Sequence, residues 1–386
     1  MSFDDAVLDD AELLSRRDPG GLLWALATAG AQVRQTVERA PEAGFDQLKA
    51  EHPPRSVLVV TDTSAPGSAQ VLARLAGFAA PAVTWSGVEL PRWAGPADAM
   101  LVGSLDGHHP RLAALAAGAA QRGLAVAAAA PAGSPLAAAA SRAALAEIAS
   151  DRHPRAGRWS ILAPLLLAGH EMGVLDCPPE LLLAVADALD EVAASCRPQG
   201  DPFTNPAKAL ALEFAETLPV IAGAGPLASI AARLTCDAIQ LYAGVPAIAI
   251  ALPDGVAIAG SLLRGDSPEA IDEFNDLFRD RVEDAPTRPR LLTIGDEPDP
   301  EQPGPGERLA GWQHVDPTDL VARRAADALH AIALQRGLPS SSVDVPLGPP
   351  LVRFGAASAF GDFTATYLAL GMGIDPSPPR PGELAL

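Results

Sequence analysis

Short apolar runs, polar loops and stretches of helical periodicity follow one another along the first half of the chain. Continuous apolar runs predict strands at 56–60, 98–104 and 123–130. A polar loop follows each run, and apolar residues at helical spacing then predict helices at 69–76, 111–122 and 136–149. Uninterrupted apolar runs are typical of strands buried on both faces, and repeated strand–loop–helix units form parallel sheets with right-handed crossovers. The first half is therefore predicted to be a doubly wound α/β domain.

A second α/β set follows residues 155–198, which read as helices. Its predicted strands are 218–225, 246–253, 290–296 and 342–348, and its predicted helices are 227–242, 267–281 and 317–336. A last helix is predicted to begin at a cap formed by Asp362 and to end at Gly371 and Gly373, before an Asp-Pro-Ser-Pro-Pro turn. Chain ends usually fray, so we expect a helix marked this clearly to be docked through its apolar side chains on the second sheet.

The length of 386 residues is more than one hydrophobic core usually serves. The pattern predicts four parts: an N-terminal helical segment over 1–50, a first α/β domain over 51–152, a helical linker over 153–204, and a second α/β domain over 205–380 with the C-terminal helix. The expected fold class is α/β, with two doubly wound, flavodoxin-like parallel-sheet domains joined by helices. A Pro-, Gly- and acid-rich segment, 295–307, is predicted to be a loop.

Composition and charge narrow the class of partner. Apolar residues make up 48% of the chain, which excludes wholesale disorder. The net charge is −19, from 47 acidic and 28 basic residues, so neither nucleic acid nor an anionic membrane is expected as a partner. The acidic N-terminus does not resemble a signal peptide and three widely spaced cysteines fit a reducing compartment, so we expect a cytoplasmic protein. His170 and Glu171 lack the second histidine of a zinc-helix motif, so no metal is expected.

Ligands of parallel α/β sheets bind beyond the carboxyl ends of the strands, where helix N-termini favour anions. Four predicted loops lie there: 61–68, 103–110, 131–135 and 223–227. The last loop belongs to "GAGPLA", Gly223–Ala228, which matches the dinucleotide pattern G-x-G-x-x-G/A. The acid that would hold the ribose should follow after about 20 residues, whereas Asp254 follows after about 30. A tight turn with no cofactor is the preferred interpretation, and a dinucleotide-dependent enzyme is kept as an alternative.

Several segments carry a more specific resemblance. In the first half they are "VLVVTDTSAPGS" (57–68), "LVGSLDGHHP" (101–110) and "DRHPRAGRWS" (151–160), and in the second half "NPAKALA" (205–211), "ARLTCDAIQLYAGVPA" (232–247) and "GDFTATYLALGMGIDPSPP" (361–379). Together they resemble the sugar isomerase (SIS) domains of the bifunctional phosphoglucose/phosphomannose isomerase family, over roughly residues 50–380. The resemblance implies two SIS domains, a homodimer, a sugar-phosphate ligand, and interconversion of glucose 6-phosphate or mannose 6-phosphate with fructose 6-phosphate.

The resemblance places a phosphate clamp in two of the loops. Where the family has a segment similar to S-x-S-G-N-T, this chain keeps Ser104 and Gly107, but Asp106 replaces the second serine and His109 the threonine. The implied substrate-binding residues are Ser64, Gly67, Ser104, Gly107, His109 and Arg155. A carboxylate in the clamp repels a dianionic phosphate, so we expect phosphate binding to be weakened.

The catalytic positions that the resemblance implies have all changed. Leu241 stands where the family has the glutamate that moves a proton between two sugar carbons. The ring-opening histidine is missing from 252–259, and the final "RPGELAL" lacks the family's lysine. Asp237 lies four residues before Leu241 on the same predicted helix face, and is a possible displaced base.

Four functions remain open at this point. The first is a cytoplasmic, dimeric pseudoenzyme that binds a sugar phosphate, as a sensor or regulatory subunit. The second is a working aldose–ketose isomerase that uses Asp237 or another displaced residue. The third is the dinucleotide-dependent enzyme, and the fourth is a non-catalytic interaction protein.

Overall fold

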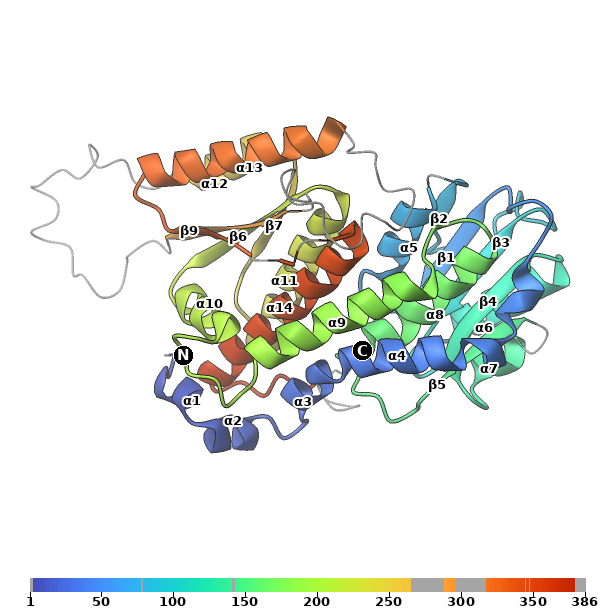
Figure 1. Ribbon diagram of the computed structural model, residues 1–386, viewed down its shortest axis with the longest axis horizontal. Helices are drawn as coiled ribbons and strands as arrows, with labels where there is room; N and C mark the ends of the chain where they lie inside the picture. Colours follow the sequence, from blue (N-terminus) through green and yellow to red (C-terminus); the bar gives the residue numbers. More distant parts are fainter. Residues whose placement is uncertain are drawn as a thin grey trace, which may run out of the picture. The chain divides into compact units, whose positions relative to one another are not determined.

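Two parallel sheets, one in each of two units, form the framework of the protein (Figure 1). The computed structural model describes residues 3–77, 79–140, 143–264, 288–295, 317–343, 345–346 and 348–378. We call Gly20–Glu191 with Ser377–Leu386 the N-terminal unit, and Met1–Pro19 with Val192–Pro376 the C-terminal unit.

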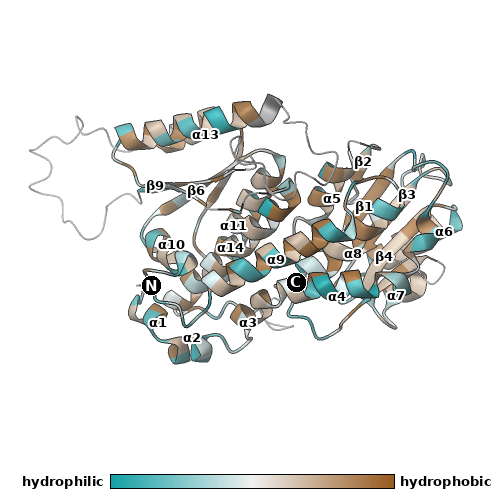
Figure 2. Ribbon diagram, in the orientation of Figure 1, coloured by the Kyte–Doolittle hydropathy of each residue, from teal (hydrophilic) through white to brown (hydrophobic). Residues whose placement is uncertain are grey.

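The sheet of the N-terminal unit has five parallel strands in the order β2-β1-β3-β4-β5. They are β1 (Val57–Thr61), β2 (Ala82–Thr84), β3 (Ala99–Gly103), β4 (Ala125–Pro131) and β5 (Ala144–Ile148). This is the flavodoxin-like order, and it confirms the predicted fold class. The strands are mainly hydrophobic (Figure 2), because β1 and β3 are buried on both faces.

Helices cover both faces of this sheet. The helices α5 (Ser68–Ala76) and α8 (Arg158–Glu171) contact one face, and α6 (Pro110–Gln121) and α7 (Pro135–Ala139) the other. The chain enters the unit through α3 (Leu22–Ala27), α4 (Ala29–Arg39) and two short 3-10 helices, η1 (Ala40–Ala43) and η2 (Phe45–Leu48). The helix α9 (Pro179–Ser195) begins in this unit.

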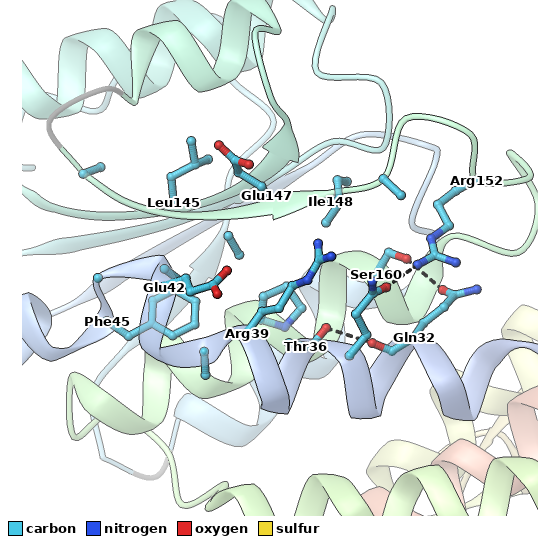
Figure 3. A pocket seen from close by; sticks show the side chains of 18 of the residues that line it. Gln32, Thr36, Arg39, Glu42, Phe45, Leu145, Glu147, Ile148, Arg152 and Ser160 are labelled. Atoms are coloured by element: carbon cyan, nitrogen blue, oxygen red, sulfur yellow. Dashed lines mark hydrogen bonds between the residues drawn. The ribbon is translucent and has the colours of Figure 1, made fainter.

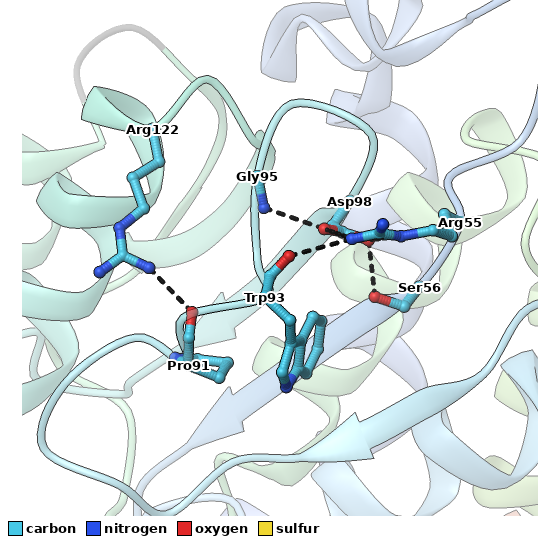
Figure 4. Close-up of polar contacts among 7 residues, drawn as sticks. All are labelled: Arg55, Ser56, Pro91, Trp93, Gly95, Asp98 and Arg122. Carbon is cyan, nitrogen blue, oxygen red and sulfur yellow. Dashed lines mark hydrogen bonds and ion pairs between the residues drawn. The ribbon is translucent and has the colours of Figure 1, made fainter.

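A buried carboxylate ties the starts of β1 and β3 together (Figure 4). Asp98 is 1% exposed, and it accepts hydrogen bonds from Arg55 Nη2 (2.8 Å), Ser56 Oγ (2.8 Å) and Gly95 N (2.9 Å). Burial by itself would raise the pKa of Asp98, but these hydrogen bonds favour the ionised form more and hold its pKa below the usual range. The carboxylate thereby helps to hold β1 and β3 in register.

The C-terminal unit repeats the pattern with four parallel strands in the order β7-β6-β8-β9. They are β6 (Leu218–Ala224), β7 (Ile248–Leu252), β8 (Pro289–Gly295) and β9 (Ser340–Ser342). One face packs on α12 (Val256–Leu262) and α13 (Pro317–Gln335), and the other on α11 (Pro226–Ala243). The helix α14 (Pro350–Gly371) packs in turn on α11 and on α10 (Pro206–Ala215), while α1 (Ala6–Asp9) and α2 (Ala11–Arg17) complete the unit.

The C-terminal helix is docked, as predicted. It begins earlier than predicted, and it packs on a different surface. It starts at Pro350, so Asp362 is not a cap. Asp362 lies within the helical segment instead and is 5% exposed. The partner surface is α11 rather than the sheet, and Gly361 allows the close approach, because a Cβ there would lie 2.1 Å from Thr235 Oγ1. The predicted end is confirmed: the helix stops at Gly371, and Gly373 has a left-handed backbone (φ +72°).

Two other element predictions were wrong. The predicted helix 136–149 is the short helix α7 followed by strand β5, because pairing with β4 extends the sheet and outweighs the helical propensity of an alanine-rich run. The predicted strand 342–348 is β9, which ends at Ser342. The predicted helix 267–281 and nearly all of the predicted loop 295–307 lie outside the described residues.

The NPAK segment holds the C-terminal unit together. Asn205 caps α10, accepting from Ala207 N and Lys208 N at 3.1 Å each. The Lys208 side chain is 1% exposed, and its ammonium donates to Leu8 O (2.6 Å), Pro198 O (2.7 Å) and Gly200 O (2.8 Å). Burial lowers the pKa of Lys208, while Asp9 and Asp201 oppose that shift. The motif is therefore structural in this protein: one ammonium joins three chain segments.

Replacing Lys208 by Met should lower the free energy of unfolding by about 3 kcal/mol, because it leaves three carbonyl groups without their donor. Urea denaturation followed by circular dichroism measures the change. Lys49→Met is the matched control, since the 3.0 Å ion pair of Lys49 with Glu171 is exposed and such pairs contribute about 1 kcal/mol or less. Equal losses in the two variants would contradict the structural role of Lys208.

Candidate functional site

Two loops meet at the carboxyl end of the sheet in the N-terminal unit. Residues 62–67 follow β1 and residues 104–109 follow β3, and these two strands are neighbours in the sheet. The strand order reverses between them, because β2 lies on one side of β1 and β3 on the other. Such a switch point is where open α/β sheets bind ligands. We call these two segments the strand-end loops.

Ser64 links the strand-end loops. Its hydroxyl donates to Asp62 Oδ1 and accepts a hydrogen bond from Leu105 N at 3.0 Å. Its own backbone N–H donates to the same carboxylate oxygen of Asp62 at 2.9 Å. Asp62 is therefore the acceptor for both donors that Ser64 offers.

The second loop repeats this arrangement. Ser104 is fully buried; its hydroxyl donates to Asp106 Oδ1 at 3.0 Å and accepts from Gly107 N at 3.0 Å. The N–H of His108 also donates to Asp106 Oδ1, at 2.9 Å. The Ser104 hydroxyl, which the resemblance assigns to a phosphate clamp, is thus bonded to the loop's own carboxylate.

Gly107 packs the second loop against a third. Its backbone is left-handed (φ +67°), and a Cβ there would lie 2.3 Å from Ser134 Oγ. Its carbonyl accepts from Leu136 N at 3.0 Å, and Ser134 caps α7 by accepting from Ala137 N at 3.2 Å. A glycine is required here for space as well as for its backbone conformation.

The other implied ligand residues lie on the adjacent segments. Gly67 has a left-handed backbone (φ +78°) and precedes α5, and His109 is exposed at the cap position of α6. Arg155 is half-buried in the loop before α8, where its N–H donates to His153 Nδ1 at 3.2 Å. Arg158, on α8, contacts the first strand-end loop, because its Nε donates to Pro66 O at 3.3 Å.

The proposed displaced base belongs to the C-terminal unit. Asp237 lies on α11, and its Oδ2 accepts from Arg233 Nη1 at 3.0 Å in an i,i+4 ion pair. Leu241, at the position of the family's glutamate, lies one turn further on and is 67% exposed. Its aliphatic side chain has no group that can accept a proton.

The glycine-rich segment after β6 serves close packing. A Cβ on Gly223 would lie 2.4 Å from the backbone of Ala228, and Ser229 Oγ donates to Gly223 O (3.0 Å) and Gly225 O (2.7 Å). The first turn of α11 therefore lies directly against the end of β6. This packing explains the match to the dinucleotide pattern without a ligand.

Within the described ranges, no group of three or more His, Cys, Asp or Glu residues is placed to hold a metal ion. Over the same part of the chain, no helix is both long and apolar enough to cross a membrane. The three cysteines are buried and unpaired, and burial raises the pKa of Cys196 to about 11 and those of Cys177 and Cys236 to about 12.

No protein-family model and no curated protein matches the sequence. Solved structures do match it. A hypothetical protein from Thermus thermophilus has a TM-score of 0.65 at 15% identity, covering 97% of this chain and 91% of its own. A glucose-6-phosphate isomerase from Chlamydia trachomatis has a TM-score of 0.63 at 11% identity, covering 97% and 82%. A tagatose-6-phosphate ketose/aldose isomerase from Escherichia coli has a TM-score of 0.55 at 13% identity, covering 95% and 94%.

These similarities concern the fold. The chain has the SIS-type fold of phosphosugar isomerase-like proteins, which confirms the fold predicted from its sequence. At identities this low the fold does not carry over a substrate or a reaction, because one fold serves many functions.

Sequence reasoning missed the partners of the two loop acids. The sequence indicated Asp106 only as a substitution and gave Asp62 no role, whereas each accepts from the N–H two residues ahead, the geometry of an Asx turn. An aspartate at the start of a short loop is the sequence signal for such a turn. Ser134 was also missed; the "SP" that opens α7 is the signal for its capping role.

Gly107→Ala should destabilise the protein by about 2–3 kcal/mol, because it adds a clash with Ser134 to the left-handed backbone strain. Gly133→Ala is the matched control: Gly133 has the same kind of backbone (φ +74°) with open space around its Cβ position. It should lose only about 1 kcal/mol. Thermal unfolding measures both, and equal losses would show that the contact with Ser134 adds nothing.

Proposed function

We propose that the protein is a divergent member of the phosphoglucose/phosphomannose isomerase family that binds a sugar phosphate weakly and does not isomerise it. The observation that supports this most directly is that Asp62 and Asp106 accept hydrogen bonds from hydroxyl and N–H groups of the strand-end loops. The proposed assembly is a homodimer in the cytoplasm, which light scattering and cell fractionation would check. The free, buried cysteines fit that compartment.

Weak binding follows from competition within the loops. A phosphate that enters must displace Asp106 from Ser104 Oγ and His108 N, or share the site with it. Two negative charges a few ångströms apart repel each other by an amount on the order of 1 kcal/mol or more, depending on how much water remains. Arg155, and the imidazole of His109 at the start of α6 when it is protonated, are proposed to offset part of this repulsion.

Loss of catalysis follows from the side chains on α11. Moving a proton between neighbouring sugar carbons needs a base at the substrate. Leu241 cannot serve as one, and the carboxylate of Asp237 is bonded to Arg233. An isomerase that used Asp237 would have as its base a carboxylate already paired with Arg233, which makes it the less favoured alternative.

A coupled assay should therefore find no turnover of glucose 6-phosphate or mannose 6-phosphate to fructose 6-phosphate. A rate above about 1 s⁻¹, the low end of ordinary enzymes, would contradict the proposal. The variant Asp237→Asn then identifies the base, because loss of that rate would assign catalysis to Asp237.

Asp106→Ser should tighten the binding of glucose 6-phosphate about tenfold, because it removes a negative charge and releases two donors. Isothermal titration calorimetry measures the dissociation constant. Asp46→Ser is the control, since Asp46 is exposed on η2 and carries the same charge. A similar gain in both variants would reveal a general charge effect.

Because these donors of the strand-end loops already have acceptors, a second candidate is also favoured, a non-catalytic interaction protein that binds no sugar phosphate. If neither the wild type nor Asp106→Ser binds glucose 6-phosphate at millimolar concentration, that candidate replaces the first.

A further inference from the structure

A cavity of about 520 Å³ lies in the N-terminal unit between α4 and the edge strand β5 (Figure 3). The short helices η1 and η2 and one side of α8 complete its wall. None of its lining residues belongs to the strand-end loops. Its volume falls within the roughly 300–1,000 Å³ of small-molecule sites.

Small side chains keep the cavity open. Along β5, side chains alternate between the two faces, and Leu145 packs into the core on the α6 side, so Ala146 and Ile148 lie on the opposite face. Ala40 and Ala43 line the wall from η1. Protein interiors are normally close-packed, so a space of this size beside short side chains indicates room for a ligand.

Two arginines line the cavity without a carboxylate partner among the described residues. Arg152 Nη2 donates to the neutral amide of Gln35 (2.6 Å), and its buried Nε has no hydrogen-bond partner in that part of the chain. Arg39 points into the space between α4 and β5 (Figure 3), and no ion pair joins it to any residue that the structure describes. Glu42 and Glu147 also line the cavity, but no ion pair joins either of them to an arginine among the described residues. A buried N–H without an acceptor is costly, and a ligand oxygen would satisfy it.

A buried polar network forms one end of the cavity. Gln32 and Ser160 are 3% and 4% exposed, and Ser160 Oγ donates to Gln32 Oε1 at 2.8 Å. Gln32 Nε2 donates to Ala156 O at 3.2 Å, and Thr36 Oγ1 donates to Gln32 O at 3.0 Å. Because both hydroxyl hydrogens are used, the oxygens of Ser160 and Thr36 remain as acceptors for hydroxyl groups of a ligand. The network holds them in place before binding.

We propose that this cavity binds a small organic acid that carries hydroxyl groups. Its anionic group, a carboxylate or a phosphate, binds Arg39 and Arg152, because guanidinium groups match both anions in geometry and charge. Its hydroxyl groups donate to Ser160 and Thr36, and its carbon chain lies along Ala146 and Phe45. The site does not depend on the strand-end loops, so it stands whether or not the proposed function is correct.

The test uses gluconate, 6-phosphogluconate, citrate and inorganic phosphate as probes in isothermal titration calorimetry with the full chain. At least one should bind the wild type with a dissociation constant below about 1 mM. A comparison of the dissociation constants of gluconate and 6-phosphogluconate shows whether the site prefers a carboxylate or a phosphate. Arg39→Gln and Arg152→Gln should each weaken that binding about tenfold or more, as expected for a lost charge-assisted hydrogen bond.

Two further variants separate this site from others. Ala146→Trp fills the cavity and should abolish binding, whereas Arg92→Gln, which removes an exposed arginine outside the cavity, should leave it unchanged. Neither Arg39 nor Arg152 belongs to the strand-end loops, so binding that both arginine variants weaken is not binding to those loops. Arg39 is exposed, so Arg39→Gln is expected to fold even if the Ala146 variant does not. The proposal is overturned if no probe binds the wild type at about 10 mM, or if both arginine variants bind as the wild type does.

Discussion

Hydrogen-bond donors at the ends of β1 and β3 need acceptors, and in this protein the chain supplies them itself. Asp62 accepts from the hydroxyl and N–H of Ser64, and Asp106 accepts from Ser104 and from the N–H of His108. The loops are therefore complete without an anion. The hydrogen bond between Leu105 N and Ser64 Oγ holds the two loops together, and the loops thereby satisfy their own polar groups.

In the C-terminal unit, buried acceptors also need partners, and here a cation supplies the donors. The ammonium of Lys208 donates to three carbonyl groups, two from the nearby Pro198 and Gly200 and one from the distant Leu8. Tyr367 of α14 donates its hydroxyl to Cys196 O at 2.5 Å in the same unit, and its ring lies 5.5 Å from the Lys208 ammonium. A segment that carries the resemblance to the isomerase family thus has a structural role, because a charge this deeply buried must be fully bonded.

The fold and the candidate site depend on different residues. The chain has the same fold as similar solved structures, and that fold rests on buried apolar strands with helices packed on them. The candidate site consists of a few polar atoms at the strand ends, and α11 carries Leu241 and the Arg233–Asp237 ion pair. Changes at such positions alter reactivity without disturbing the sheets.

The sequence by itself determined the strands whose apolar runs are buried on both faces, such as β1 and β3, and the end of α14 at Gly371. It also determined that Leu241 has no group that can accept a proton, because residue identity alone decides that. Only the tertiary structure decided that 144–148 is a strand, since its choice rests on pairing with β4. It alone revealed that Asp106 accepts from Ser104, and that space remains between α4 and β5. These features depend on which distant atoms meet, and local sequence preferences do not specify such contacts.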